Sequence, residues 1–493
     1  MSRDIHGASR PQDIELNYDD DDDDEGLVFS LNDGDPANNP SGNNSLEDDG
    51  EHDVVLKLSD LQGDPSSPLY SAKTFEQLGL SDEIMRGIHD MGFRRPSKIQ
   101  EMALPLLLAN PPYNMIAQSQ SGTGKTAAFM LNILSRVDVG LQKPQALVLA
   151  PTRELARQIG DVLKKMGRYT NVKGQFAIPN MVDKGQMMNA HVIIGTPGTA
   201  IDCIRRRILP VQDIKMFVVD EADNMLDQQN MADQCIRVKM AMPAGVQIVL
   251  WSATFPTSVV SYAEHFAPNA NTLSLKHAEL TVVGIKQMYM DCANEADKYR
   301  VLTDLYKVLT IGSSVIFVKR RVDADKIYKR MTDAGHKVAV LHSGLENSSC
   351  RDSVIDDFRS GKAKVLITTN VLARGIDVAT VSMVVNYDLP TMVTNSGMVI
   401  VDTPTYLHRI GRTGRFGRVG VSISFVHNQS TWRELCEVAD YFNVPMQKVP
   451  ADDIDEVERI VNKFLKSGPP KKGDIMEHSR HEVSRPPQRP SRR

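Results

Sequence analysis

Residues 119–126 have the types and spacing of a loop that binds nucleotide phosphates. Glycines let backbone N–H groups close around oxyanions, and the N-terminus of a following helix adds a positive end. Lys125 is expected to reach the β- and γ-phosphates, and Thr126 to ligate Mg²⁺. A merely glycine-rich turn is the alternative, because Ser119 stands where the usual pattern begins with glycine. The candidate ligands are Ser121, Gly122, Thr123, Gly124, Lys125 and Thr126.

An acidic pair, Asp220 and Glu221, follows the apolar run at residues 216–219. A carboxylate at the end of a strand can hold Mg²⁺ directly or through water, so Asp220 is a candidate metal ligand. Its neighbour Glu221 can polarise an attacking water. The alternative is a helix N-terminus that simply favours acids. The phosphate loop upstream favours the catalytic interpretation.

Three arginines, Arg409, Arg412 and Arg415, are spaced by three residues in a segment interrupted by glycines. Such arginines can converge on one anion. The half of the chain with the phosphate loop has no arginine finger, and a finger raises turnover by roughly 10³–10⁵. A solvated basic face or an RNA-phosphate patch is the alternative. The candidate catalytic residues are therefore Lys125, Asp220, Glu221, Arg412 and Arg415.

Two series of alternating strands and helices must position these residues. Helical stretches such as 154–166 separate the strands, which predicts right-handed crossovers and parallel sheets, with ligands at the carboxyl ends of the strands. The first series has apolar runs at 115–117, 146–149, 191–194, 216–219 and 248–251. The second has them at 315–318, 338–341, 365–368, 383–386 and 421–425. Only the first contains a phosphate loop, which indicates a cleft between two similar domains.

The predicted organisation is a domain at 65–266, a linker at 267–284 and a second domain at 285–466, between tails at 1–64 and 467–493. Residues 1–64 hold 19 acidic and three basic side chains, a net charge of −16, whereas the rest of the chain carries +11. Acidic and polar composition predicts disorder in the first tail, and Pro, Arg and Ser predict it in the second. The acidic tail is either a solubilising segment or a nucleic-acid mimic. Residues 54–58 could dock on the body as a helix or strand.

The remaining composition narrows the class of protein. The five cysteines are scattered without paired spacing, which favours a reducing compartment and no structural zinc. No apolar stretch approaches the roughly 18 residues of a membrane span, and the N-terminus does not have the pattern of a signal peptide. A mildly basic body is typical of polyanion binders, although many neutral binders share it.

From residue 70 to about 465 the chain resembles the DEAD-box RNA helicases, whose motifs occur here in order. The resemblance implies an α/β fold of two tandem RecA-like domains, with ATP and Mg²⁺ as cofactors. It implies that Phe75 stacks on adenine, that Gln100 reads it, and that Asp377 meets the ribose. It implies coupling of the site to the second domain through Ser252, Thr254 and His408. The implied RNA contacts are Pro151, Thr152, Arg153, Thr196, Gly198, Gly344 and Thr369.

Residues 64–71, 116–129 and 452–456 resemble the mRNA-export branch of that family. This implies a monomer in cytoplasm and nucleus, at the cytoplasmic face of the nuclear pore complex. It also implies RNA, a nucleoporin and an inositol-phosphate-assisted activator as partners. Residues 392–403 are longer and more apolar than the family's link at this point. We expect an RNA-stimulated ATPase that remodels RNA duplexes and RNA–protein complexes; the alternatives are an ATP-dependent RNA clamp, a translation-related helicase and, more distantly, a DNA translocase.

Overall fold

A computed structural model describes residues 28–29, 54–57, 71–119, 123–182, 185–227, 230–275, 285–308, 312–345, 348–370, 381–394, 397–414, 419–442, 444 and 446–466. Four predicted site residues, Ser121, Gly122, Asp377 and Arg415, lie outside these ranges. Within them, no helix has the length and apolar character needed to cross a membrane.

The first sheet contains parallel strands in the order β5-β6-β4-β7-β8-β3-β9, with β1 and β2 added antiparallel at its two edges. Its strands are β1 (Val28–Phe29), β2 (Val54–Lys57), β3 (Met115–Gln118), β4 (Ala146–Leu149), β5 (Gly174–Ala177), β6 (Val192–Gly195), β7 (Met216–Val219), β8 (Gln247–Ser252) and β9 (Asn271–Leu275). Its helices are η2 (Phe75–Leu78), α1 (Asp82–Asp90), α2 (Lys98–Leu107), α3 (Lys125–Arg136), α4 (Arg153–Met166), α5 (Pro197–Arg205), α6 (Ala222–Asp227), α7 (Met231–Met240) and α8 (Thr257–Phe266).

The second sheet is parallel throughout, in the order β12-β13-β11-β14-β17-β10-β18. Its strands are β10 (Ile285–Asp291), β11 (Ser314–Phe317), β12 (Val338–Leu341), β13 (Val365–Thr368), β14 (Met383–Asn386), β17 (Gly420–Val426) and β18 (Gln447–Val449). Its helices are α9 (Asp297–Val308), α10 (Arg321–Asp333), α11 (Ser348–Arg359), α12 (Thr403–Ile410), α13 (Gln429–Phe442) and α14 (Ile454–Lys466).

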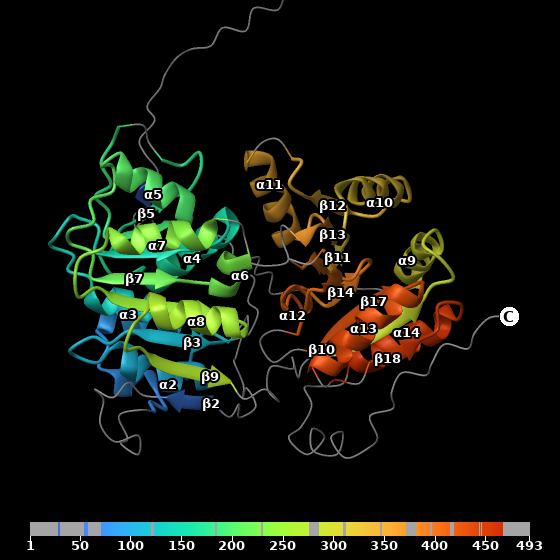
Figure 1. Ribbon diagram of the computed structural model, residues 1–493, viewed down its shortest axis with the longest axis horizontal. Coiled ribbons are helices and arrows are strands. Elements are labelled where there is room, and N and C mark those ends of the chain that lie inside the picture. Colours follow the sequence, from blue (N-terminus) through green and yellow to red (C-terminus); the bar gives the residue numbers. More distant parts are fainter. Residues whose placement is uncertain are drawn as a thin grey trace, which may run out of the picture.

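The central strands are buried along their whole length, because helices cover both faces of each sheet. Apolar side chains on the two faces of the first sheet form separate cores, such as Val148 and Val218 on one face and Leu147 and Phe217 on the other. The two sheets lie side by side, with α6 and α12 facing each other between them (Figure 1). The predicted pair of tandem RecA-like α/β domains is confirmed.

The predicted linker begins too early. Strand β9 lies inside it and pairs in parallel with β3, the strand that leads into the phosphate loop. Its sequence, Asn-Thr-Leu-Ser-Leu, is short and mostly polar, so it lacks the apolar run that marks a central strand. On its outer side β9 pairs with β2, which confirms that the segment at 54–58 docks as a strand.

The long segment at 392–403 includes a two-stranded hairpin, β15 (Thr391–Val393) and β16 (Val399–Val401). Apolar side chains at the hairpin are exposed to solvent, among them Val393 at 67 % and Met398 at 63 %. Val401 at its base is buried with Tyr406 in the core under α12 and α13. The segment is thus attached to the second domain while its tip carries apolar surface.

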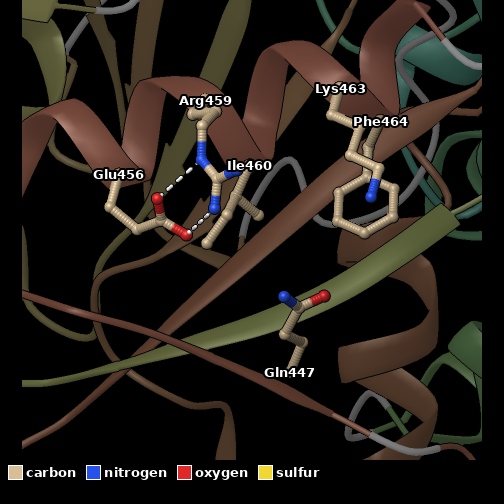
Figure 2. A pocket seen from close by; sticks show the side chains of 6 residues that line it. All are labelled: Gln447, Glu456, Arg459, Ile460, Lys463 and Phe464. Carbon is tan, nitrogen blue, oxygen red and sulfur yellow. Dashed lines mark hydrogen bonds and ion pairs between the residues drawn. The ribbon is translucent and has the colours of Figure 1, made fainter.

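A small cavity of about 150 Å³ lies between β18 and α14, far from the first sheet. Figure 2 shows its lining, in which Glu456 and Arg459 on successive turns of α14 form two ion-pair contacts of 2.7 Å. The ring of Phe464 also contributes to the wall, with the ammonium of Lys286 5.6 Å from its centroid. Since Arg459 is paired within its own helix, this cavity is not a ready-made anion site.

Candidate nucleotide and RNA site

Residues at the start of α2 support the loop before α3 through hydrogen bonds. Ser97 caps α2, and its hydroxyl donates to the backbone oxygen of Thr123 at 2.7 Å. Gln100 accepts from the Ser97 N–H at 3.0 Å and donates to the Gly124 oxygen at 2.9 Å. Gly124 has φ of 91°, and a Cβ there would lie 2.3 Å from the Gln100 amide nitrogen. The position therefore requires glycine, and Gln100 supports the loop in addition to any contact with a base.

Lys125 points from the first turn of α3 to the acidic pair after β7. Its ammonium lies 2.5 Å from Glu221 Oε1 and 3.5 Å from Asp220 Oδ1, and all three side chains are buried. Burial would lower the pKa of Lys125, but the charges of Asp220 and Glu221 outweigh it and raise the pKa. The lysine is therefore cationic and placed to neutralise anions at this edge of the sheet.

The two carboxyl groups of the acidic pair differ in their pKa. Burial, together with the neighbouring charge of Glu221, raises the pKa of Asp220 to about 6 against the attraction of Lys125. For Glu221, burial is overcome by Lys125 and His408, which lower its pKa. Glu221 also has φ of 56°, a left-handed conformation that is costly for a residue with a side chain. Glu221 is thus held as a carboxylate in a strained turn, which fits a residue that polarises water.

Asp223 joins the first domain to the second. Its Oδ2 accepts from the backbone N–H and hydroxyl of Thr254, at 3.1 and 2.8 Å. The backbone N–H of Asp223 in turn donates to Ser252 Oγ at 3.2 Å. From α12, His408 Nε2 lies 3.1 Å from the same Oδ2. The residues predicted to couple the domains therefore meet at Asp223, which the sequence analysis had not listed as a site residue.

A bound Mg²⁺ fits the residues beside Lys125. Asp220 Oδ2 is buried and has no hydrogen-bond partner within the described residues, so a hard cation would satisfy it. Thr126 follows Lys125 on the first turn of α3. Glu221, Asp223 and His408 also bring ligand atoms within 4.8 Å of one another. The Asp223 carboxylate there is already engaged by Thr254, so that group is a hydrogen-bonded junction.

Of the three arginines predicted to converge on one anion, the structure describes Arg409 and Arg412, whose guanidinium groups have different partners. Arg412 is 5 % exposed, and its Nε donates to the His408 backbone oxygen at 3.0 Å, which keeps it on the side of α12 near the junction. Arg409 turns inward, where it donates to Asn370, Asn386 and the Asp388 oxygen. Helix α12 ends at Ile410 with Gly411 as its C-cap, so Arg412 lies beyond the helix that carries Arg409, and the spacing of three residues does not place the two side chains on one helical face.

A second contact between the domains lies at the start of α4. Thr152 caps this helix by accepting from Leu155 N–H at 3.2 Å. On the first turns of the helix, Arg153 Nη2 lies 3.4 Å from Asp352 Oδ2, and Arg157 Nη1 lies 2.8 Å from Asp352 Oδ1. Asp352 belongs to α11, so a residue predicted to bind RNA is bridged to the opposite domain. The sequence offered no signal for Asp352, because an acid in a helix is most often solvated.

The other predicted RNA residues lie at turns that follow strands. Pro151 is buried next to Thr152, and Thr196 begins α5 with its hydroxyl 3.2 Å from Thr199 Oγ1. A Cβ on Gly198 would meet Gln234 at 3.3 Å, and one on Gly344 would meet His342 at 3.1 Å. Thr369 directly follows β13 and is 8 % exposed. Gly198 and Gly344 are closely packed against neighbouring side chains, and RNA binding at all these positions stays a prediction.

Phe75 is buried in the core of the first domain, with 2 % of its surface exposed. The ring belongs to the core cluster that also includes apolar residues of α1, α2 and α3. This gives Phe75 a packing role. Stacking on adenine stays a prediction, because it requires the ring to be uncovered.

Comparison with known proteins agrees with this geometry. The sequence model of DEAD/DEAH box helicases matches residues 97–262, and that of the helicase conserved C-terminal domain matches residues 297–417. The ATP-dependent RNA helicase DBP5 of Candida albicans is 60 % identical over 417 residues, which cover 84 % of this chain and 76 % of that protein. The protein of the same name from Saccharomyces cerevisiae S288c is 57 % identical over 417 residues, covering 84 % and 86 %.

Solved structures give the same result. Dbp5 of S. cerevisiae bound to RNA and ADP BeF3 matches with a TM-score of 0.77 and 57 % identity, covering 80 % of this chain and 100 % of that chain. A variant of the yeast protein bound to Nup159, a Gle1 variant, IP6 and ADP matches with a TM-score of 0.60 and 55 % identity, covering 79 % and 100 %. The identities, the coverage and the two matched helicase domains lead to one assignment: this chain belongs to the DEAD-box family of ATP-dependent RNA helicases.

Proposed function

We propose that this helicase is an RNA-stimulated ATPase that remodels RNA duplexes and RNA–protein complexes during mRNA export. The observation that carries the proposal is the contact between His408 and Asp223, 3.1 Å across the two domains. It lies beside the acidic pair and Lys125, so the hydrolytic residues and the domain contact form one site. A site that is complete only when the domains meet can be controlled by whatever brings them together.

The roles of the residues follow from their positions. Lys125 and the loop before α3 bind the nucleotide phosphates, and Gln100 reads the adenine edge. Asp220 and Thr126 hold Mg²⁺, which supplies charge neutralisation at the phosphates when bound. Glu221 orients the attacking water, because its carboxylate stays ionised beside Lys125. Arg412 reaches the transferred phosphate from the second domain.

RNA binding on both domains would supply the closure. The predicted contacts divide between the first domain, with Arg153 and Thr196, and the second, with Thr369. Single-stranded RNA lying across both, held through phosphates and 2′-hydroxyls, would favour the same closed state as ATP. A closed state that accepts only one strand in a bent shape would expel a complementary strand or a bound protein.

A clamp that holds RNA and hydrolyses ATP as a slow timer uses the same residues. ATPase turnover with and without RNA, in the wild type and in Glu221→Gln, tests the shared core of both functions. Strand displacement measured beside the RNA off-rate separates them: displacement faster than spontaneous melting supports remodelling, whereas slow release without displacement supports the clamp. Turnover that RNA leaves unchanged would contradict both, and stimulation by single-stranded DNA would favour a translocase.

The partners follow from the solved relatives. The yeast Dbp5 variant was solved with Nup159, a Gle1 variant and IP6, which supports a nucleoporin and an inositol-phosphate-assisted activator as partners of this chain. Such partners would locate it at the cytoplasmic face of the nuclear pore complex, with access to nucleus and cytoplasm. Pull-down of tagged full-length chain with and without inositol hexakisphosphate tests this; activator capture independent of the polyphosphate would contradict its assisting role.

A further inference from the structure

Arg409 is a buried cation that donates to the uncharged oxygens of Asn370, Asn386 and the Asp388 backbone. It is 1 % exposed, and burial lowers its pKa to about 10. Its Nε and Nη2 donate to Asn370 Oδ1 at 3.1 and 2.5 Å, and its Nη1 donates to the Asp388 backbone oxygen at 2.6 Å and to Asn386 Oδ1 at 3.3 Å. Burying a guanidinium is costly unless its donors are satisfied. Such an arrangement fixes the position of the guanidinium, and its cost is the desolvation of a charged group.

The groups that Arg409 contacts lie at the carboxyl ends of adjacent strands. Asn370 comes two residues after the last residue of β13, and Asn386 is the last residue of β14. The guanidinium lies 4.9 Å from the centre of the Phe317 ring, at the end of β11. Arg409 therefore fixes α12 against three neighbouring strands of the second sheet, and its fork reaches two of them at once.

The neighbours of this pair in sequence belong to the two functional surfaces. Thr369, next to Asn370, is the predicted RNA contact of this strand end. His408, next to Arg409, reaches Asp223 and lies 3.6 Å from Glu221 in the first domain. Two short covalent steps and two noncovalent contacts thus separate the RNA side from the Glu221 carboxylate. The noncovalent contacts are the hydrogen bond from Arg409 to Asn370 and the contact between His408 and Glu221.

We propose that the Asn370–Arg409 pair is the positioning contact through which RNA at the end of β13 sets the orientation of α12, and so of His408 and Arg412, at the nucleotide. Arg409 acts through its neighbours and touches neither ATP nor RNA. The inference rests on the proposed function, because it takes RNA-stimulated hydrolysis as its readout. It explains why an arginine directly beside a junction residue points away from the nucleotide.

The test uses the full chain with Asn370→Ala, Arg409→Lys and the double variant. Lysine keeps the charge but cannot span Asn370 and Asp388 as the guanidinium does. Turnover at saturating RNA should fall about tenfold in each, within the roughly 5- to 150-fold range of coupling between sites. RNA-free turnover and the half-saturating RNA concentration should stay within about twofold. The double variant should match Arg409→Lys alone, because both changes break one contact.

Two further variants make the result specific. Asn370→Asp keeps an acceptor for the guanidinium and should retain stimulated turnover, while Asn370→Ala should not. Asn428→Ala is the control. Asn428 is an exposed asparagine of the same domain, and its hydrogen bonds within the described residues go to neighbours in its own turn, such as Thr431. This variant should behave as wild type. Stimulated turnover that is retained in Asn370→Asp and lost in Asn370→Ala would show that Arg409 needs a hydrogen-bond acceptor at position 370.

Three results would overturn the inference while leaving the proposed function in place. If RNA-free and RNA-stimulated turnover fall together and the Tm is lower, the Asn370–Arg409 pair only stabilises the fold. A higher half-saturating RNA concentration with turnover intact would make Asn370 an RNA ligand. If the losses of turnover add up in the double variant, Asn370 and Arg409 do not act through one shared contact. A wild type that RNA does not stimulate would overturn the proposed function and this inference together.

Discussion

The imidazole of His408 lies between two carboxylates of the opposite domain: Nε2 is 3.1 Å from Asp223 Oδ2, and Nδ1 is 3.6 Å from Glu221 Oε2. Glu221, the residue proposed to orient water, therefore lies against the ring that joins the two domains. Glu221 is ionised partly because His408 is there. Separating the domains would change the surroundings of Glu221 as well as remove Arg412, so an open enzyme should hydrolyse slowly for two reasons.

Glu221→Gln should bind ATP and RNA but hydrolyse about 10²–10⁴ times more slowly, the usual contribution of a general base. The amide keeps the shape of the side chain and loses the charge that polarises water. Turnover and nucleotide affinity should be measured together, with the exposed Glu264→Gln as the control. Near-normal turnover would remove Glu221 from its role.

Arg412→Ala should lose RNA-stimulated hydrolysis by roughly 10³ or more, as expected for an arginine finger, while the first domain still binds nucleotide. The reason is its position just after α12, where its Nε donates to the backbone oxygen of His408. Single-turnover hydrolysis and ATP binding check this, with exposed Arg433→Ala as the matched control. If the variant hydrolyses normally and only its RNA affinity drops, the residue is a phosphate binder. The same outcome is expected for Arg415, which lies outside the described residues.

Asp352→Asn should raise the half-saturating RNA concentration about fivefold without changing maximal turnover, because it removes contacts that favour the closed state. The bridge joins Asp352 to Arg153 and Arg157 of the first domain. RNA titration of ATPase is the measurement. Asp357→Asn, whose partner Lys362 belongs to the same domain, is the control. A lower half-saturating concentration would mean instead that Asp352 competes with RNA for Arg153.

ATP should be preferred over GTP, because one acceptor and one donor on Gln100 match the amino group and N7 of adenine, whereas guanine offers two acceptors there. Gln100→Ala should reduce the preference about tenfold and also weaken binding of both nucleotides, since its amide supports Gly124. Ser97→Ala removes the bond to the Thr123 oxygen and the cap bond from the Gln100 N–H, leaves the Gln100 amide in place, and should weaken binding of both nucleotides equally. Equal use of both nucleotides by the wild type would contradict the assignment.

Deleting residues 1–27, which include the aspartates at 19–24, should lower the half-saturating RNA concentration at low salt. A tethered acidic segment competes with RNA phosphates at an effective concentration on the order of millimolar, and salt screens the competition. Deleting residues 1–57 also removes β1 and β2, so a larger effect of that deletion would be due to the strands. Unchanged RNA dependence in both would leave the tail without a part in the cycle.

The elements that the sequence predicted best are those with a continuous apolar run. Residues 216–219 and 383–386 form β7 and β14 with the predicted ends, because strands buried on both faces are mostly apolar and stand out in the sequence. Strands at or near the sheet edges were missed, since β5 and β9 carry Gly, Gln, Asn and Thr. A polar edge strand has the composition of a loop.

The residues of the site also divide into those that the sequence predicts and those that it misses. Lys125, Asp220 and Glu221 were predicted and do meet, because local motifs at strand ends fix their positions. The inward turn of Arg409 and the bridge through Asp352 depend on tertiary contacts, with partners far away in the sequence. Spacing along a helix says which residues share a face, and only the packing decides what that face meets.

The antiparallel strands at both edges of the first sheet bear on how the chain folds during synthesis. Val28 pairs with Gln175, and Val54 pairs with Leu275, so each leading strand waits for a partner made much later. Such long-range pairings form slowly, because the intervening chain must first be closed into a loop. The parallel core can assemble as it emerges, while one edge stays open until β1 pairs with β5 and the other until β9 has been translated and pairs with β2. During that interval the exposed strand edges could bind a chaperone. Afterwards β1 and β2 of the protein itself cover them.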